Sequence, residues 1–493
     1  MTVMQEDSTL ASLNLFRQQV ADLDDAVRGD AARRLERWRP WITRASYLPS
    51  AGNLAAYLAL RCHDIRDVQS ELITWGASSL GRCEAYVLPN LEAVQGTLAA
   101  LAGEARLPDR GAFALLDARL GVHTRDLFGE GPTPGIMVTF PSEAADDPVL
   151  IRDLLEAGMT VARINLAHDD EAAWGRMLLH LNAACEATGK SCRVLMDLAG
   201  PKVRTGQPRW PKKQDRLSTG EQLILATDEA SLPDDLPGVT CTLPEAVRQA
   251  QVGQSVWFDD GKIGTLIERA EGGVLTLRVT HAPPKGAKLK AEKGINFPDT
   301  TLNLPALTDK DRQDVHFAVK HANMLGYSFV QTLGDVQALL DELEALDAPA
   351  GLGIVLKIET KLAVQNLADL MVKVAGTRPC GVMIARGDLA VELGFARLTE
   401  IQEEMLWLAE AAHLPVVWAT QVLEGLVKKG EAKRGEFTDA ANGVRAEVIM
   451  LNKGPFVVEG VREVSGIIGR MRQHFNKKRP QFRALNIAQP GTD

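Results

Sequence analysis

Polar and charged side chains stand at the ends of successive apolar runs in this 493-residue chain. The residues concerned are Arg163, Asn165, Asp197, Lys357, Glu359, Arg386, Asp388 and Thr420. Glu359 and Asp388 offer the hard carboxylate oxygens that Mg²⁺ and Mn²⁺ prefer, with substrate phosphate and water as further ligands. Each residue taken singly also fits a solvated strand end. Their shared position at the ends of apolar runs favours a site.

Cations accompany these carboxylates. Arg163, Lys357 and Arg204 can neutralise phosphate oxygens while a phosphoryl group is transferred. The backbone N–H groups of Gly387 and Asp388 can hold a carboxylate if a short helix begins there. Divalent metal, phosphate and carboxylate binding together predict chemistry on a phosphorylated organic acid.

Short apolar runs alternate with amphipathic helical stretches from Gly135 onward. The expected strands span residues 136–140, 160–166, 193–198, 327–332, 353–359, 381–386, 415–420 and 448–451. This alternation predicts an α/β fold with a parallel sheet, and eight strands are the number that a closed (β/α)₈ TIM barrel uses. An open doubly wound sheet is the structural alternative. The stretch 136-IMVTFPSEAADDP-148, however, lacks the glycine fingerprint of a dinucleotide-binding sheet.

Other regions depart from this alternation. Residues 1–130 show helical spacing of apolar positions, which predicts a helical N-terminal extension, and the Gly- and Pro-rich stretch 121–135 is expected to be a linker. Residues 207–299 contain β-type runs between turn residues, which predicts a small β-barrel lid domain inserted at the barrel mouth. The expected barrel therefore comprises residues 131–206 and 300–478. A tail at 479–493 follows it.

The composition, with 45% hydrophobic and 24% charged residues, is that of a large globular protein. A net charge of -9 argues against a nucleic-acid or membrane-surface binder, because those classes carry a basic excess. The cysteines show no paired spacing and indicate neither a disulfide framework nor a zinc site. The N-terminal residues do not resemble a signal peptide, so we expect a cytoplasmic protein.

A series of motifs runs in order over about residues 135–475. They are 158-GMTVARINLAH-168, 197-DLAGPKVRTG-206, 256-VWFDDGKI-263, 293-KGINFP-298, 303-NLPALTDKDRQD-314, 354-IVLKIE-359, 381-GVMIARGDLAVE-392 and 418-WATQVLEGL-426. Together they resemble the pyruvate kinase family. The resemblance implies a (β/α)₈ barrel with a β lid after the third strand. It also implies an ATP-forming phosphotransferase of glycolysis that converts phosphoenolpyruvate and ADP to pyruvate and ATP.

The resemblance implies a role for each matching residue. Arg163 would contact the transferring phosphate, and Lys357 would stabilise the charge on it and on the enolate oxygen. Glu359 and Asp388 would hold the divalent metal, Mg²⁺ or Mn²⁺. The pyruvate carboxylate would be bound by Gly387, Asp388 and Thr420, with Thr420 near the face where the enolate is protonated. The nucleotide site would contain Asn165, His168, Arg204 and Lys293.

The chain departs from the family pattern at the site where many members bind K⁺. Ala167 replaces a Ser whose hydroxyl is a ligand, Leu198 replaces a Thr, and Lys202 replaces a Glu. An ammonium group can take over the electrostatic role of a bound monovalent cation. We therefore expect Lys202, with Asn165 and Asp197, to substitute for K⁺, so that K⁺ is not required.

Further departures leave alternatives open. Ala199 replaces a Lys of the family pattern, and 450-MLNKGPFVVEG-460 replaces a Ser-Gly-Glu-Thr pattern. A phosphotransferase acting on another phospho-acid and a non-catalytic regulatory paralogue are the alternatives. The chain ends soon after the last expected barrel helix, so we expect neither the family's C-terminal domain nor its usual sugar-phosphate activation. Assembly into a homo-oligomer stays open.

Overall fold

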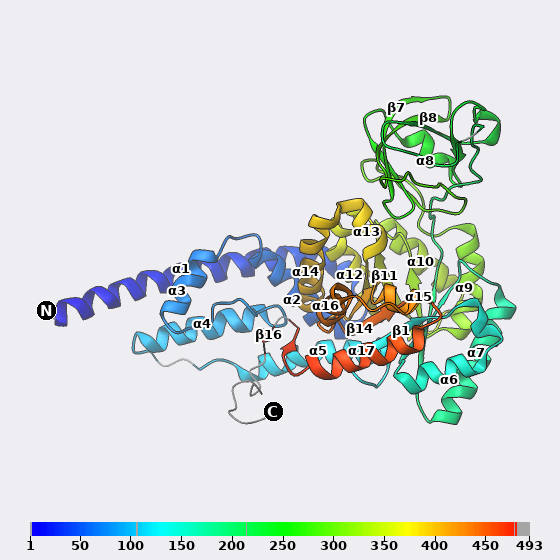
Figure 1. The fold of residues 1–493 in the computed structure, drawn as a ribbon. Helices are drawn as coiled ribbons and strands as arrows, with labels where there is room; N and C mark the ends of the chain where they lie inside the picture. The colour runs from blue at the N-terminus through cyan, green and yellow to red at the C-terminus, as the bar shows by residue number, and fades with distance from the viewer. Residues whose placement is uncertain (1, 105–106, 213, 478, 481–493) are drawn as a thin grey trace, which may run out of the picture.

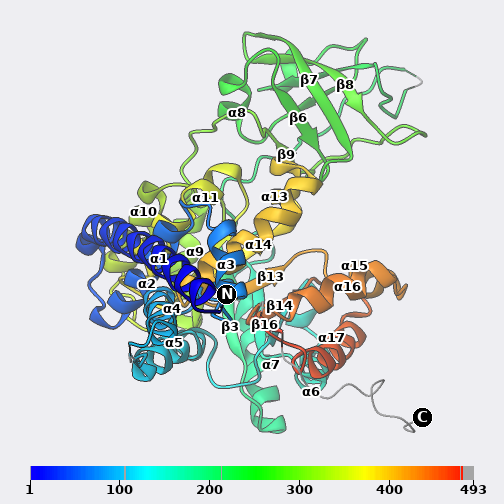
Figure 2. The same cartoon turned by 90° about the vertical axis from the view of Figure 1, so that its left-hand side faces the viewer.

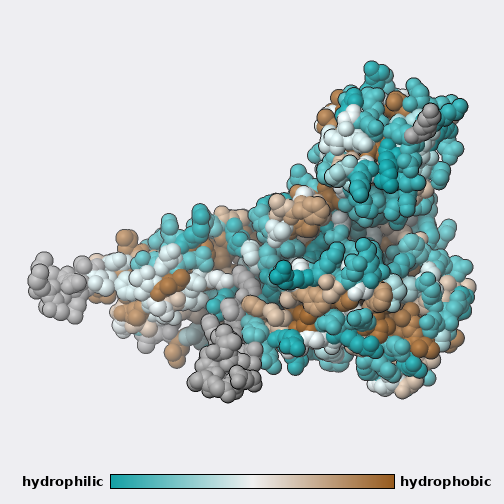
Figure 3. Space-filling model, in the orientation of Figure 1, coloured by the Kyte–Doolittle hydropathy of each residue, from teal (hydrophilic) through white to brown (hydrophobic). Residues whose placement is uncertain are grey.

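The computed structural model describes residues 2–104, 107–212, 214–477 and 479–480. An arm of N-terminal helices extends to one side of a barrel, and a β-rich lid stands above the barrel (Figure 1). The lid is also separate from the barrel in the view turned by 90° (Figure 2). Its visible surface is largely hydrophilic, whereas the surface of the arm is mixed (Figure 3).

Within the described residues, eight parallel strands close into a barrel in the order β1-β14-β13-β12-β11-β10-β3-β2. Their bounds are β1 (Gly135–Thr139), β2 (Val161–Asn165), β3 (Arg193–Asp197), β10 (Met324–Tyr327), β11 (Gly353–Ile358), β12 (Cys380–Ala385), β13 (Val416–Ala419) and β14 (Val448–Leu451). The strands are buried on both faces, which explains why they are continuous apolar runs in the sequence. The expected (β/α)₈ barrel is confirmed, and the open-sheet alternative is wrong.

The fourth barrel strand does not lie where the sequence pattern predicts it. The expected strand spans residues 327–332, whereas β10 is Met324–Tyr327. Phe329 and Val330 continue the apolar pattern beyond the strand, but Phe329 has a φ of 54°. Because this left-handed conformation is incompatible with an extended strand, residues 328–332 form the loop that leads into the next helix.

Helices surround the barrel. They are α6 (Pro148–Ala157), α7 (Glu171–Thr188), α9 (Asp309–His321), α10 (Leu333–Ala345), α11 (Lys361–Gln365), α12 (Leu367–Ala375), α13 (Arg386–Leu393), α14 (Phe395–Ala411), α15 (Glu424–Lys429), α16 (Arg434–Gly443) and α17 (Val457–Met471). The hydroxyls of Thr308, Thr332 and Thr360 cap the first turns of α9, α10 and α11. These caps fix the point at which each loop at the barrel mouth enters its helix.

The lid follows β3 and has its own hydrophobic core, which includes Phe258 and Leu277. Its strands are β4 (Gln222–Ala226), β5 (Gly238–Thr240), β6 (Ser255–Phe258), β7 (Ile263–Glu271), β8 (Val274–His281) and β9 (Ile295–Asn296), in the order β5-β4-β8-β7-β6-β9. The expected lid is therefore present. The expectation of purely β structure is wrong in one respect, because the short helix α8 (Pro244–Gln249) lies between β5 and β6.

The N-terminal arm is helical, as predicted. Its helices are α1 (Thr2–Trp38), α2 (Leu48–Leu60), α3 (Arg66–Thr74), α4 (Val87–Leu101) and α5 (Arg110–Phe128). Trp38 Nε1 donates a hydrogen bond to Asp369 Oδ1 on α12 at 2.8 Å, and Asn53 Nδ2 donates to the Ala411 carbonyl of α14 at 2.8 Å. The arm therefore packs on the outer helices of the barrel.

The end of α5 closes the floor of the barrel. Leu127 is 1% exposed and clusters with strand residues such as Met137 and Met383. A Cβ added at Gly353 or Gly381 would come within 2.2 or 2.6 Å of the Leu127 side chain, so both glycines make room for it. The predicted linker at 121–135 is wrong for its first part, because burial of Leu127 keeps the chain helical to Phe128 despite the local composition.

The expected tail at 479–493 lies outside the described residues except for Arg479 and Pro480. These form strand β16, which pairs with β15 (Phe475–Asn476). Over the described ranges, no helix has both the length and the apolar character needed to cross a bilayer.

Candidate active site

Asp197 lies at the mouth of the barrel, at the end of β3, between two cations. Its Oδ2 accepts a hydrogen bond from Arg163 Nε at 2.9 Å and lies 3.2 Å from Lys357 Nζ. Arg163 Nη1 also donates to the Thr139 hydroxyl at 2.8 Å. Asp197 is only 1% exposed, and such a buried charge persists because it is paired. The structure thus brings together three residues that the sequence analysis selected separately.

The charges in this cluster hold one another ionised. Burial raises the pKa of the Asp197 carboxyl, but Arg163 and Lys357 outweigh it, so the pKa lies below its usual value. Burial likewise lowers the pKa of the Lys357 ammonium, but Asp197 and Glu359 raise it above its usual value. Lys357 therefore offers a fixed positive charge in a site with little water. Such a charge stabilises an anion that develops during a reaction.

Ser328 is a part of this site that the sequence analysis missed. Its hydroxyl accepts a hydrogen bond from Lys357 Nζ at 2.6 Å and donates one to the Leu198 carbonyl at 2.6 Å. The sequence pattern does not single out Ser328, because it predicts a strand over residues 327–332 with Ser328 in its interior. In the structure, Ser328 is the first residue after β10. If the strand is taken to end at Tyr327, Ser328 becomes a polar residue at a strand end, which is the pattern that marks the other site residues.

Glu359 follows β11 and is 4% exposed. Its Oε2 accepts the Phe329 N–H at 2.7 Å, and its Oε1 lies 3.4 Å from Lys357 Nζ. Burial raises the pKa of Glu359 and the nearby Asp388 adds to the rise, whereas Lys357 and Lys202 oppose it. A further positive charge beside Glu359 would therefore stabilise the ionised form of its carboxyl group.

Asp388, on the first turn of α13, already has a cation beside it. Lys202 Nζ lies 2.9 Å from Asp388 Oδ1 and 3.0 Å from Oδ2. Comparison with the family pattern predicts instead that Lys202 lies with Asn165 and Asp197. Asn165 and Asp197 are indeed partners in the register of β2 and β3, but Lys202 is directed to Asp388.

The chain between β3 and the lid is held in a defined position. Asp311 Oδ1 accepts the backbone N–H groups of Ala199 and Gly200 at 2.9 and 3.3 Å. Gly200 has a φ of 65°, and a Cβ there would come within 2.9 Å of Ser328 and Phe329. Glycine is therefore required at this turn, which directs Lys202 across the mouth.

Thr420 and Gly387 meet on the opposite side of the mouth. The Gly387 N–H donates to Thr420 Oγ1 at 2.8 Å. Thr420 has a φ of 62°, a strained conformation for a β-branched residue. Arg386 holds it there, with Nη2 donating to the Thr420 carbonyl at 2.7 Å and Nε donating to the Ala419 carbonyl at 3.0 Å. Strain that is held in this way is common at functional sites.

The residues expected at the nucleotide site are only partly brought together. Burial lowers the pKa of His168, and the nearby charges of Lys453 and Arg204 lower it further. His168 and Arg204 thus share a positively charged side of the mouth. Lys293 instead pairs within the lid, with its Nζ 3.1 Å from Asp259 Oδ1. Asn165 Oδ1 accepts the Ala167 N–H at 3.1 Å.

The carboxylates of Glu359 and Asp388 fit a hard divalent cation that takes its other ligands from substrate and water. The Lys202 ammonium on Asp388 shows that this position attracts positive charge. Over the described residues, no group of three or more His, Cys, Asp and Glu side chains is arranged to hold a metal. The protein part of such a site would therefore be small, as is usual where Mg²⁺ binds together with a phosphate.

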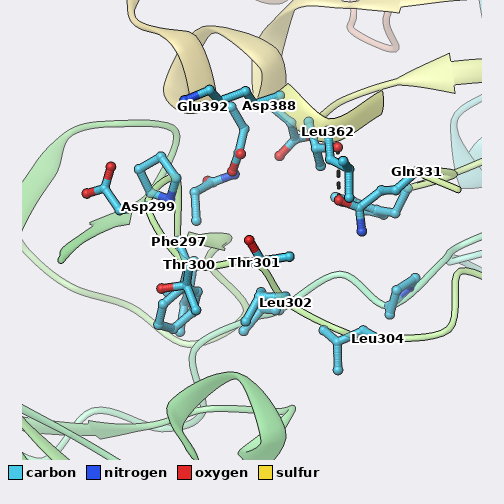
Figure 4. Close-up of a pocket in the computed structure, with 18 of the residues that line it drawn as sticks. Phe297, Asp299, Thr300, Thr301, Leu302, Leu304, Gln331, Leu362, Asp388 and Glu392 are labelled. Carbon is cyan, nitrogen blue, oxygen red and sulfur yellow. Dashed lines mark hydrogen bonds between the residues drawn. The ribbon is translucent and has the colours of Figure 1, made fainter. Parts of the chain in front are cut away.

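A crevice of about 410 Å³ opens beside Asp388, between the lid and the barrel. Figure 4 shows Asp388 and Glu392 of α13 on one side, with Thr301 and Leu302 of the chain that returns from the lid facing them. Burial raises the pKa of Glu392 to about 7. The crevice gives solvent and small molecules a route to the Lys202–Asp388 pair.

The chain is similar in sequence to known proteins. A family model described as the pyruvate kinase barrel domain matches residues 133–455. Pyruvate kinase of Geobacillus stearothermophilus is 30% identical over 343 residues, which are 67% of this chain and 55% of that protein. Pyruvate kinase of Bacillus licheniformis is 31% identical over 347 residues, or 68% and 57% of the two chains. Pyruvate kinase PKLR of Rattus norvegicus is 30% identical over 357 residues, or 69% and 60%.

The chain spans a little more than half the length of these relatives, between 55% and 60%. The matched part contains the whole closed barrel, from β1 to β14, and the lid between β3 and β10. It also contains the cluster around Asp197, the Glu359 and Asp388 carboxylates, and the Thr420 turn. The chain belongs to the pyruvate kinase family.

Proposed function

We propose that this protein transfers the phosphoryl group of phosphoenolpyruvate to ADP, giving pyruvate and ATP, an ATP-forming step of glycolysis. The observation that carries the proposal is the buried cluster in which Arg163 and Lys357 flank Asp197, next to the carboxylates of Glu359 and Asp388. Related proteins named pyruvate kinase, which are 30 to 31% identical, support it.

The proposed roles follow from the charges. Arg163 contacts the transferring phosphate, and Lys357 stabilises negative charge on that phosphate and on the enolate oxygen as the P–O bond breaks. The new bond forms to an oxygen of the ADP β-phosphate. The enolate carbon then takes a proton on the face near Thr420, which gives pyruvate. The backbone amides of Gly387 and Asp388, with Thr420, bind the substrate carboxylate.

Glu359 and Asp388 hold the divalent metal, Mg²⁺ or Mn²⁺, in this proposal. When bound, the metal supplies positive charge to the phosphate oxygens. The nucleotide phosphates lie toward the positively charged side of the mouth, where Asn165 and His168 come from the barrel rim and Arg204 from the connection to the lid. Lys293 joins them from the lid after leaving Asp259. We take residues 207–299 as the lid domain and residues 131–206 with 300–478 as the barrel.

We further propose that turnover does not require K⁺. Ala167 offers no hydroxyl ligand, and Asp197 already faces Arg163 and Lys357. Lys202 adds a third cation to a site that carries three carboxylates, Asp197, Glu359 and Asp388. A bound K⁺ would add positive charge where the protein already supplies it.

A coupled assay with lactate dehydrogenase tests both proposals. The protein is supplied with phosphoenolpyruvate, ADP and Mg²⁺ in tetramethylammonium buffer, with and without K⁺, and Lys357→Met is the control. We expect pyruvate formation well above the control, at a similar rate in both buffers. Activity that collapses without K⁺ and returns with it contradicts K⁺ independence. No activity in either buffer contradicts the reaction.

A second candidate is transfer from another phospho-acid. The observation that favours it is Ala199, where the family pattern has a Lys, together with the loop 451-LNKGP-455 after β14. A phospho-acid other than phosphoenolpyruvate that gives a higher kcat/KM with ADP would support this candidate.

A further inference from the structure

The contact between Lys202 and Asp388 occupies the carboxylate that the proposed function assigns to the metal. The ammonium lies within 3.0 Å of both carboxylate oxygens. The side chain of Lys202 is 26% exposed and that of Asp388 is 15% exposed, so the pair is partly desolvated but reaches solvent along the crevice. A divalent cation that coordinates Asp388 therefore competes with Lys202 for the same two oxygens.

The chain on both sides holds Lys202 in place. Its backbone N–H donates to the Gly200 carbonyl at 2.9 Å, which completes the turn fixed by Asp311. Gly294 of the lid packs on its stem, because a Cβ at this glycine would lie 3.4 Å from Lys202 Cε. The lysine is thus positioned by the lid hinge rather than swinging freely in solvent.

Three carboxylates and three cations pair with one another at the mouth when the ammonium sits on Asp388. The carboxylates are Asp197, Glu359 and Asp388, and the cations are Arg163, Lys357 and Lys202. A divalent ion that enters this balanced set adds two positive charges and also frees an ammonium close by. An anionic phosphate that binds at the same time restores the balance.

We propose that Lys202 is an intramolecular competitor of the divalent metal, and that it thereby couples metal binding to binding of the phosphorylated substrate. Without substrate, Lys202 holds Asp388 and the metal binds weakly. With phosphoenolpyruvate bound, the metal takes Asp388 and the released ammonium lies near the substrate's negative charge. This inference rests on the proposed function, because it uses the metal site assigned there. Thermodynamic linkage requires the coupling to be reciprocal.

Mn²⁺ binding, followed by the electron paramagnetic resonance signal of free Mn²⁺, measures this competition without turnover. In the absence of substrate, we expect Lys202→Met to bind Mn²⁺ about tenfold more tightly than the wild type, because no ammonium competes or repels. Lys202→Arg keeps the charge and should bind like the wild type. Lys361→Met is the matched control, because Lys361 lines the same crevice without contacting Asp388, and it should change nothing.

The same titration with saturating phosphoenolpyruvate and no ADP measures the coupling. We expect the substrate to tighten Mn²⁺ binding strongly in the wild type and about tenfold less in Lys202→Met. Equal or weaker Mn²⁺ binding by Lys202→Met without substrate overturns the proposal. Asp388→Asn distinguishes an error in the proposed metal site from an error in the proposed competition. If it binds Mn²⁺ like the wild type, the metal site of the proposed function is wrong. If it loses Mn²⁺ while Lys202→Met is unchanged, only the competition is wrong.

A measurement on the wild-type protein covers the case in which Lys202→Met does not fold. Reductive ¹³C-methylation labels the lysines and keeps their charge, and Lys202→Arg assigns the Lys202 signal by its loss. We expect Mg²⁺ with phosphoenolpyruvate to shift this signal as the ammonium leaves Asp388. A signal that stays in place while Mg²⁺ binds contradicts displacement.

Discussion

At the scale of single residues, the strand-end rule found most of the site because it uses a property of the fold. Arg163, Asp197 and Lys357 were selected only as polar ends of apolar runs, and they meet because parallel strands of a barrel end at one rim. The partner of Lys202 could not be predicted in this way. Lys202 lies in a loop, and its direction depends on a glycine turn and on the packing of the lid.

Removal of the Ser328 hydroxyl should slow the proposed reaction. Ser328→Ala leaves the Lys357 ammonium without its 2.6 Å partner, so the ammonium is less well oriented toward the phosphate. We expect kcat to fall about tenfold with little change in KM, which is a typical cost of losing one hydrogen bond to a charged group. Steady-state kinetics check this. Ser70→Ala, at an exposed helix position, is the control.

Arg386 should be irreplaceable by Lys. Its guanidinium donates to two carbonyls and to Asp439, and it lies 4.4 Å from the Trp418 ring centroid. A lysine has a single ammonium group and cannot donate to both carbonyls and to Asp439 at the same time. We expect Arg386→Lys to lower kcat/KM for phosphoenolpyruvate by about 10- to 100-fold, because the strained Thr420 turn relaxes. Arg397→Lys, an exposed pair on α14, should be neutral, and a neutral Arg386→Lys would contradict this role.

At the scale of elements, α5 shows where local composition misleads. The glycines and prolines of 121–135 predict a linker, yet the helix continues because its last turn fills the barrel floor. Sequence patterns reflect local propensity, but they carry no information about the space at the barrel floor, which is lined in part by the distant residues Gly353 and Gly381. Gly353 and Gly381 looked like ordinary strand ends, and only the packed barrel explains them.

Truncation of Leu127 should destabilise the protein. Leu127→Ala removes a side chain that is 1% exposed and leaves a cavity beneath the strands. We expect the free energy of unfolding to fall by about 2–5 kcal/mol, the usual range for a buried leucine. Denaturant unfolding measures this. Leu115→Ala on the same helix is the control, since that side chain is 60% exposed, and an equal effect of both changes would contradict the packing role.

His413 should make the junction of arm and barrel sensitive to acid. Burial lowers its pKa to about 4, and the hydrogen bond between its Nε2 and the Ala85 carbonyl, at 2.7 Å, opposes this fall only in part. The unfolded state takes up the proton first, so this contribution to stability is complete above about pH 6.5 and is lost as the pH falls toward 4. The shift corresponds to about 3 kcal/mol.

Urea unfolding at pH 7 and pH 5 tests this with His413→Asn. Asn tolerates the φ of 53° at this position and does not titrate, so the variant should lose less stability between the two pH values than the wild type. The difference between the proteins is what counts, because burial raises the pKa of Glu410 to about 7 and its effect has the opposite sign. Parallel pH profiles would contradict the role of His413.

At the scale of the whole molecule, the order of arm, barrel and lid could be predicted from changes in periodicity along the chain. Their arrangement in space could not, because it depends on contacts between distant segments. Trp38 with Asp369 and Asn53 with Ala411 attach the arm to barrel helices that no local pattern connects. The turn at Gly200 likewise leads the chain from the barrel toward the lid, and the crevice beside Asp388 lies between the two parts.

Phosphorus-31 NMR of the protein with phosphoenolpyruvate, ADP and Mg²⁺ in K⁺-free tetramethylammonium buffer tests the central claim most directly, because it follows donor and acceptor together. We predict that the phosphoenolpyruvate signal decays as the γ-phosphate signal of ATP rises in equal amount, and that Lys357→Met shows neither change. A phosphoenolpyruvate signal that persists at the level of Lys357→Met, with or without added K⁺, would contradict the account.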